Sequence, residues 1–154
     1  KIAVLGGPAT SYPSMMRRQG AQQAMEDAGI RFEDKLYGLS NYDFESAYHA
    51  MNGLLARRAE FTALFAMSDV IAFGAIRALV SAGLRVPEDV SVIGFDGITM
   101  SRYCVPVMTT IVQPSEQIAL QSIELLVRQI EHGTPAQTVT LQPELQQGES
   151  VRAI

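Results

Sequence analysis

Hydrophobic positions along the chain follow two periods, which alternate from the N-terminus to the C-terminus. Short apolar runs bounded by glycine, proline or polar residues are typical of buried strands, whereas apolar positions three or four residues apart are typical of amphipathic helices. The short runs predict strands at residues 2–5, 31–37, 61–67 and 90–95, a further short strand within 106–114, and two extended pieces around Pro143. The helical spacing predicts helices at residues 14–28, 44–57, 68–83 and 115–131.

Strands that alternate with helices of this length predict βαβ units, and hence a mainly parallel sheet covered by helices on both faces. We therefore expect a three-layer α/β fold with a sizeable core. In folds of this kind, ligands bind beyond the carboxyl ends of the strands. Polar or aromatic side chains occur at four predicted strand exits, at residues 6–14, 38–43, 67–69 and 96–100. These exits form the candidate site.

Composition and charge narrow the classes of function. The chain has 16 acidic and 12 basic residues, a net charge of −4, and lacks the clustered Lys and Arg that neutralise nucleic-acid phosphates. The single cysteine, Cys104, cannot form an intramolecular disulfide, which fits a reducing compartment. No apolar run approaches the length of a membrane span. We expect neither membrane association nor direct DNA binding by this segment.

The sequence lacks the common motifs for catalysis, metal binding and cofactor binding. The loop GGPATSYPS lacks the Gly-Lys-Ser/Thr ending of a phosphate loop and the Gly-x-Gly-x-x-Gly spacing of a dinucleotide site. No His or Cys spacing typical of a metal site occurs, and Ser68-Asp69 lacks the Gly-x-Ser-x-Gly frame of a nucleophile. We therefore expect no cofactor, no metal and no enzyme activity.

Each residue at the strand exits has both a plain and a functional interpretation. One of Arg17 and Arg18 is a solvated charge, and the other donates its planar guanidinium to ligand oxygens. Tyr42 either packs on the surface or stacks on a ligand ring, and Asp96 either closes a turn or accepts hydrogen bonds from a ligand. Ser68 is predicted to cap the helix that follows it. Convergence on one edge of the sheet favours the functional interpretation for the group.

The same positions lie in motifs that resemble a known family. The pieces AMSD, GAIRAL, AGLRVPEDVSVIGFD and MTTIVQP resemble, in order and spacing, the signature of the lactose-repressor/galactose-repressor family of bacterial transcription regulators. The opening IAVLGGP, followed by RRQGAQQAMEDAGI, resembles the Gly-Pro loop and the arginine-bearing helix of that family. The resemblance covers essentially the whole chain.

What the resemblance implies is a cytoplasmic, periplasmic-binding-protein-like sensor that clamps a small effector between two α/β lobes. The effector is usually a sugar or a nucleobase-type molecule, and an N-terminal helix-turn-helix reads operator DNA in a homodimer. Effector binding then changes operator affinity allosterically. By motif, the effector-binding residues are Arg17, Tyr42, Ser68 and Asp96. Tyr42 stands where relatives carry Phe or Trp, and Gly97 replaces the polar residue that they usually carry after the acid.

The resemblance also implies a division of the chain. Residues 1–107 correspond to the C-terminal lobe of the effector-binding domain, and residues 108–133 to a crossover strand and helix that normally belong to the N-terminal lobe. Residues 134–154 return to the C-terminal lobe. The helix-turn-helix and most of the N-terminal lobe are absent, so we expect a piece of a longer protein. The apolar stripe of the helix at residues 115–131 is then left without its usual partner.

Two other functions remain open. A periplasmic sugar-binding protein of a transport system shares the lobed fold, and would need a secretory signal on the full gene where a regulator would carry a helix-turn-helix. An α/β enzyme with Asp96 as general acid or base is a weaker alternative, because no second carboxylate, His or metal cluster accompanies it in a catalytic frame.

Overall fold

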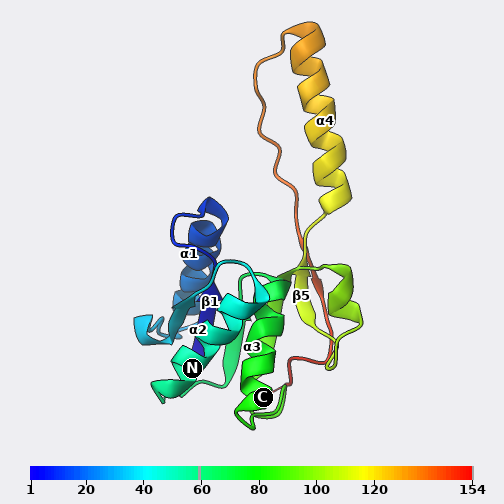
Figure 1. Cartoon of the computed structure of the whole chain (residues 1–154). Helices are drawn as coiled ribbons and strands as arrows, with labels where there is room; N and C mark the ends of the chain where they lie inside the picture. The colour runs from blue at the N-terminus through cyan, green and yellow to red at the C-terminus, as the bar shows by residue number, and fades with distance from the viewer. Residues whose placement is uncertain (59, 154) are drawn as a thin grey trace.

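A computed structural model describes residues 1–58 and 60–153 of the 154-residue chain. Its strands form one sheet in the order β2-β1-β3-β4-β5-β6 (Figure 1). The strands are β1 (Ile2–Gly6), β2 (Tyr37–Leu39), β3 (Ala63–Ala66), β4 (Ser91–Asp96), β5 (Thr109–Val112) and β6 (Glu144–Gln146). The helices are α1 (Tyr12–Asp27), α2 (Phe44–Ala56), α3 (Asp69–Ser81) and α4 (Ser115–His132), with 3-10 turns η1 (Asp34–Leu36) and η2 (Thr99–Arg102). The predicted α/β fold is confirmed.

Strand direction determines where the loops that leave the sheet meet. β1 pairs in parallel with both β2 and β3, β3 pairs in parallel with β4, and β4 pairs in parallel with β5. β6 runs antiparallel to β5, with Leu145 opposite Ile111. The carboxyl ends of β1 to β5 therefore lie at one edge of the sheet, which we call the carboxyl edge.

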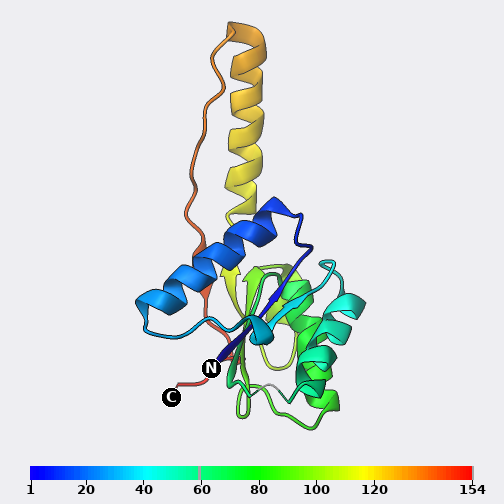
Figure 2. The ribbon, with the colours of Figure 1, turned by 90° about the vertical axis from the view of Figure 1, so that its left-hand side faces the viewer.

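α2 and α3 pack side by side on one face of the sheet and close the main core (Figure 2). Leu5, Leu64 and Val92 supply the strands' share of this core, and each is at most 1 % exposed. Burying side chains of this size contributes about 1.5–3 kcal/mol each. Gly74 lets the two helices approach closely, because a Cβ there would overlap the backbone carbonyl of Phe44.

The opposite face of the sheet is only partly covered, by α1. A groove of about 500 Å³ remains between this helix and the strands. Its strand-borne lining is largely apolar and includes Ile2, Val4, Phe65, Ile93, Phe95 and Ile111. α1 contributes small residues such as Gly20 and Ala21, which leave the groove open, and it contributes Arg17 as well.

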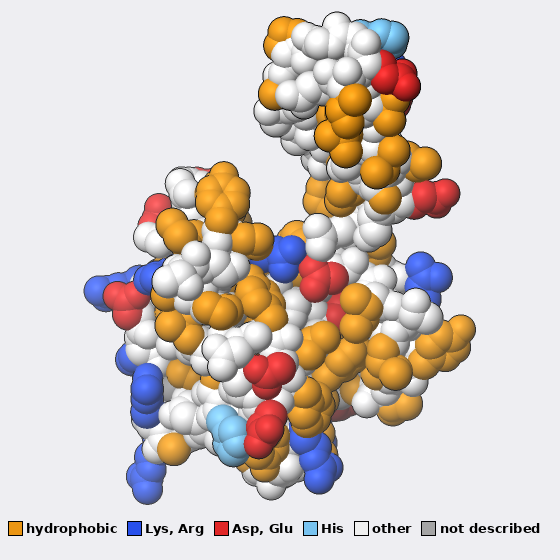
Figure 3. All heavy atoms as spheres, turned by 45° about the horizontal axis from the view of Figure 1, so that its top comes forward, with side chains coloured by type: hydrophobic (Ala, Val, Ile, Leu, Met, Phe, Trp, Pro, Cys, Tyr) orange, Lys and Arg blue, Asp and Glu red, His pale blue; other side chains and the backbone are white. Residues whose placement is uncertain are grey.

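α4 leaves the sheet after β5 and projects from it as an arm (Figures 1 and 2). It contains no buried residue among those described, and residues 134–143 run back beside it. Six of its apolar side chains are 41–73 % exposed (Figure 3): Ile118, Leu120, Ile123, Leu126, Val127 and Ile130. The predicted apolar stripe is thus present and uncovered. No helix in the described part of the chain has both the length and the apolar character needed to cross a membrane.

Two predicted segments differ from the structure. Residues 31–36 do not form a strand, and β2 begins only at Tyr37, where the chain pairs with β1. Phe32 and Tyr37 pack around Arg18 of α1. Of the two extended pieces predicted in the tail, only the one containing β6 pairs as a strand in the described residues. β5 lies within the segment at residues 108–133 that the resemblance assigns to the crossover, and it pairs with β4 as a member of the sheet, so the chain leaves the sheet at Gln113. The division of the chain into lobes stays a prediction.

The exposure of α4 predicts that its apolar residues contribute little to the stability of the isolated chain. Leu126→Ala should change the free energy of unfolding by no more than about 0.5 kcal/mol, because the side chain is already half exposed. The matched change Leu64→Ala in β3 should cost about 2–5 kcal/mol. Urea denaturation of both variants measures this, and an equal cost for the two would show that α4 is covered in solution.

Candidate functional site

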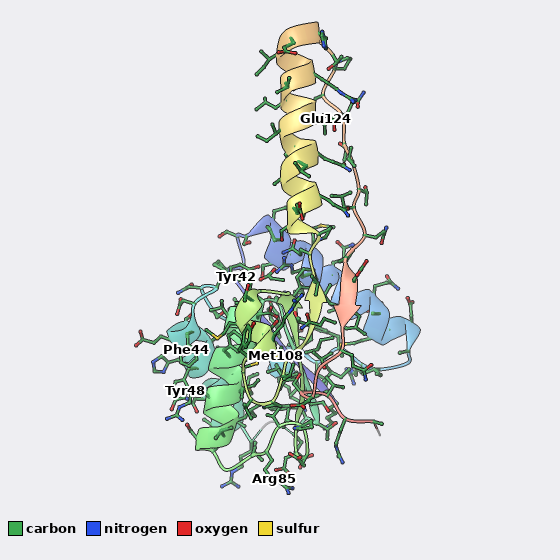
Figure 4. The ribbon with its side chains drawn as sticks, turned by 90° about the vertical axis from the view of Figure 1, so that its right-hand side faces the viewer. Tyr42, Phe44, Tyr48, Arg85, Met108 and Glu124 are labelled. Carbon is green, nitrogen blue, oxygen red and sulfur yellow. The ribbon has the colours of Figure 1, made fainter. Side chains whose placement is uncertain are left out.

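The four residues predicted to bind a ligand lie at or near the carboxyl edge of the sheet. Tyr42 follows β2, Ser68 follows β3, and Asp96 ends β4, while Arg17 reaches over from α1. Figure 4 shows Tyr42 at the end of the body from which α4 leaves, and Arg85 at the opposite end. The α/β topology therefore brings together residues that are far apart in the sequence.

Arg17 and Asp96 are joined directly. Arg17 Nη2 donates to Asp96 Oδ1 at 3.2 Å, and Arg17 Nη1 donates to the backbone carbonyl of Met67. The guanidinium carbon lies 3.8 Å from the centre of the Phe95 ring, a cation–π contact. With its side chain only 17 % exposed, Arg17 is fixed by an acid, a carbonyl and an aromatic face at once. Arg18, the other member of the pair, instead contacts Asp34 at the surface.

Asp96 is held from a second side by Gln113, the residue that follows β5. Gln113 Nε2 donates to the same Oδ1 at 2.7 Å. None of the described residues donates a hydrogen bond to Asp96 Oδ2. Partial burial raises the pKa of Asp96, although the charge of Arg17 and the Gln113 hydrogen bond oppose the rise. One carboxylate oxygen is therefore fixed, and the other accepts no hydrogen bond from the residues that the structure describes.

Tyr42 has an unusual backbone and a constrained ring. Its φ is 60°, in the left-handed region, which few non-glycine residues adopt. The ring lies against Gly7, where a Cβ would overlap it. The phenolic oxygen is buried and has no hydrogen-bond partner among the described residues. The aromatic ring is thus held beside the Gly-Pro loop, and its role toward a ligand stays a prediction.

Ser68 caps α3, as its sequence position predicts. Its Oγ accepts a hydrogen bond from the backbone N–H of Ile71 at 3.1 Å, and the residue is only 4 % exposed. The hydroxyl is therefore engaged by the helix in this structure. Of the four predicted residues, Arg17 and Asp96 touch each other, whereas Tyr42 and Ser68 are held by their own local contacts.

Two polar residues beside the predicted site are not among the predicted ligand-binding residues. Gln113 follows the short strand predicted within residues 106–114, and a polar residue directly after a strand is the same signal that selected Asp96. Asp69 is fully buried and accepts hydrogen bonds from Thr110 and Ile98. A polar Thr110 inside a buried strand was the available hint of a buried polar partner.

The chemistry of this edge suits hydrogen bonding to a neutral polar ligand. Arg17 is already paired with Asp96, so the pair offers little net charge to attract an anion. In the residues that the structure describes, no group of three or more His, Cys, Asp or Glu side chains is placed to hold a metal ion. What the edge offers is a carboxylate acceptor at the end of β4, an arginine from α1 and an aromatic ring on the loop after β2.

The contact between Gly7 and Tyr42 predicts a sharp difference between two glycines. Gly7→Ala should lower the free energy of unfolding by about 1–3 kcal/mol, because the added methyl displaces the Tyr42 ring. Gly20→Ala is the control, since a Cβ there meets nothing within 4 Å and the position is inside α1. It should raise stability by up to about 1 kcal/mol. Urea denaturation checks both, and a neutral Gly7→Ala would contradict the close packing.

Comparison with known proteins supplies independent findings. Residues 1–151 match the family described as periplasmic binding protein-like domain. The chain is 39 % identical over 137 residues to the HTH-type transcriptional regulator MalR of Clostridium butyricum, covering 89 % of this chain and 41 % of that protein. It is 36 % identical over 154 residues to the HTH-type transcriptional repressor PurR of Histophilus somni (strain 129Pt), covering 99 % and 46 %.

A solved structure of the transcriptional regulator CelR in complex with cellobiose superposes on this chain with a TM-score of 0.92 at 34 % identity. The match covers 97 % of this chain and 46 % of that one. The chain thus spans less than half the length of these relatives.

Proposed function

The chain belongs to the periplasmic binding protein-like domain family, and we propose that it is the effector-sensing part of a bacterial transcription regulator. Its relatives MalR and PurR are HTH-type transcriptional regulators, which supports a regulator over a transport protein. In this proposal the chain binds a small molecule and performs no catalysis. Binding alters the affinity of a helix-turn-helix elsewhere in the full-length protein for operator DNA.

The observation that carries the proposal is the unequal hydrogen bonding of the two Asp96 carboxylate oxygens. Oδ1 is fixed by Arg17 and Gln113, and Oδ2 has no donor among the described residues although the side chain is only 26 % exposed. A partly desolvated carboxylate oxygen binds a hydroxyl donor strongly, because charge-assisted hydrogen bonds are about twice as strong as neutral ones. Asp96 therefore accepts a hydrogen bond from the effector, and Arg17 keeps the acceptor in place.

The effector class that fits this edge is a carbohydrate. A sugar presents many hydroxyl donors and no charge, whereas a phosphate or carboxylate would meet the negative charge of Asp96. The ring of Tyr42, beside the Gly-Pro loop, offers an apolar surface for the sugar's carbon face. The cellobiose in the CelR structure supports this choice of class.

The uncovered arm supports the proposed division of the full-length protein. In this proposal residues 1–107 form the C-terminal lobe, residues 108–133 form the segment that leads across to the N-terminal lobe, and residues 134–154 return to the C-terminal lobe. β5 stays in the C-terminal sheet, so α4 is the part of the crossing segment that packs in the other lobe. The effector lies between the lobes, and the full-length protein is a homodimer that acts in the cytoplasm, where operator DNA lies.

Isothermal titration calorimetry on the full-length protein tests this function. The panel contains cellobiose, other disaccharides, hexoses and nucleobases. We expect one carbohydrate to bind, and Asp96→Ala to weaken its affinity by about 10- to 100-fold, because a buried charged hydrogen bond is lost. The affinity of Asp96→Asn should fall between those of the wild type and Asp96→Ala, since the amide keeps one neutral acceptor oxygen.

The control is Asp34→Asn, which makes the same acid-to-amide change at an exposed surface pair with Arg18. Its affinity should stay within about 2-fold of wild type, because exposed ion pairs contribute little. Unchanged carbohydrate binding by Asp96→Ala would overturn the assignment. Binding of a nucleobase alone would overturn the carbohydrate class and keep the regulator.

A further inference from the structure

Asp69 is a fully buried acid at the start of α3, which none of the roles above uses. Its Oδ1 accepts a hydrogen bond from Thr110 Oγ1 at 2.5 Å, and its Oδ2 accepts one from the backbone N–H of Ile98 at 2.8 Å. Asp69 and Thr110 are both 0 % exposed. Burial raises the pKa of Asp69, and the two hydrogen bonds oppose the rise. A buried carboxylate is costly unless it is well paired, so this one has a demanding environment.

The two bonds tie together three separate elements. Asp69 begins α3, Thr110 lies in β5, and Ile98 lies in the loop that follows β4. The backbone leaves room for the acid at Gly94 of β4, where a Cβ would overlap Asp69 Oδ1. From the start of α3, Asp69 therefore joins the loop after β4 to the neighbouring strand β5. We call this pair of hydrogen bonds the Asp69 clamp.

The loop that Asp69 clamps is the one that carries Asp96. Asp96 has a φ of 115° and Gly97 a φ of 71°, so two successive residues adopt positive φ. Such a backbone persists at a non-glycine residue only when the surroundings hold it. On one side the N–H of Gln113 donates to the carbonyl of Asp96 at 3.2 Å. On the other side Asp69 holds the N–H of Ile98, two residues further along.

We infer that Asp69 is a positioning residue for the effector site: by fixing Ile98 and Thr110, it holds the Asp96–Gly97 turn so that Asp96 Oδ1 faces Arg17 and Gln113. The inference deepens the proposed function: the effector role of the turn rests on that function, whereas the positioning of Asp96 by Asp69 does not. An acid is required because both partners are donors within reach of one short side chain, and a carboxylate supplies two acceptor oxygens. A residue that only stabilised the fold could bond any part of the loop, whereas Asp69 bonds the backbone N–H of Ile98, two residues after Asp96.

Nuclear magnetic resonance on this chain, without ligand, tests the positioning role. The readouts are the hydrogen-exchange rate of the Ile98 amide and the side-chain amide resonances of Gln113, which report the clamp and the Asp96 contact. Asp69→Ala should raise the hydrogen-exchange rate of the Ile98 amide by at least about 10-fold more than it raises the rate of amides that exchange only through global unfolding. It should also shift the Gln113 side-chain resonances toward those of a solvated amide.

Ala78→Gly is the matched control, because it weakens α3 without touching the loop. It should leave the Gln113 resonances and the relative Ile98 exchange unchanged. Thr110→Val removes one anchor with little change of shape, and keeps the test decisive if Asp69→Ala does not fold. It should loosen Ile98 less than Asp69→Ala. The inference is overturned if Asp69→Ala changes both readouts no more than Ala78→Gly, or, where Asp69→Ala is unfolded, if Thr110→Val leaves both unchanged.

Failure of this inference and failure of the proposed function are distinguishable. If the Asp69 and Thr110 variants move the Ile98 and Gln113 signals while Asp96→Ala binds carbohydrate normally, the clamp stands and the function is wrong. If Asp96→Ala loses binding while the Asp69 and Thr110 variants leave both signals at their wild-type values, the function stands and the clamp is wrong.

Discussion

Partial burial of a carboxylate at the end of a strand is costly unless donors compensate it, and this requirement organises the carboxyl edge of the sheet. Asp96 obtains donors from two directions, Arg17 on α1 and Gln113 after β5. Arg17 is in turn anchored on the carbonyl of Met67 and the face of Phe95. The acid therefore links the first helix, the central strands and the exit of β5 through one oxygen atom.

The same acid contacts the segment that leads from β5 into the arm. Gln113 contacts Asp96 with both its backbone and its side chain, Pro114 follows, and α4 begins at Ser115. Under the proposed function, an effector bound to Asp96 therefore lies beside the segment that leads directly into α4. The body formed by the sheet with α2 and α3 has its own core and does not depend on the arm.

Local patterns in the sequence predicted most of the fold, because strand runs, helical spacing and caps are encoded within each element. The N-cap at Ser68 and the apolar stripe of α4 followed directly, whereas the exposure of that stripe was expected from the family resemblance. The errors arose where tertiary contacts decide. Residues 31–37 alternate like a strand, yet Phe32 and Tyr37 pack on Arg18 and only the end of the segment pairs with β1. The burial of Asp69 could not be predicted locally, because its hydrogen-bond partners lie 29 and 41 residues away in the sequence.

The position of the effector relative to Asp96 tests the central claim most directly. A crystal structure of the full-length protein with its bound carbohydrate measures it. The account predicts an effector hydroxyl at about 2.5–3.0 Å from Asp96 Oδ2, with Oδ1 still held by Gln113. An effector bound with no oxygen within about 4 Å of Asp96 would contradict it, and would leave the Arg17–Asp96 pair as a purely structural feature of the sheet edge.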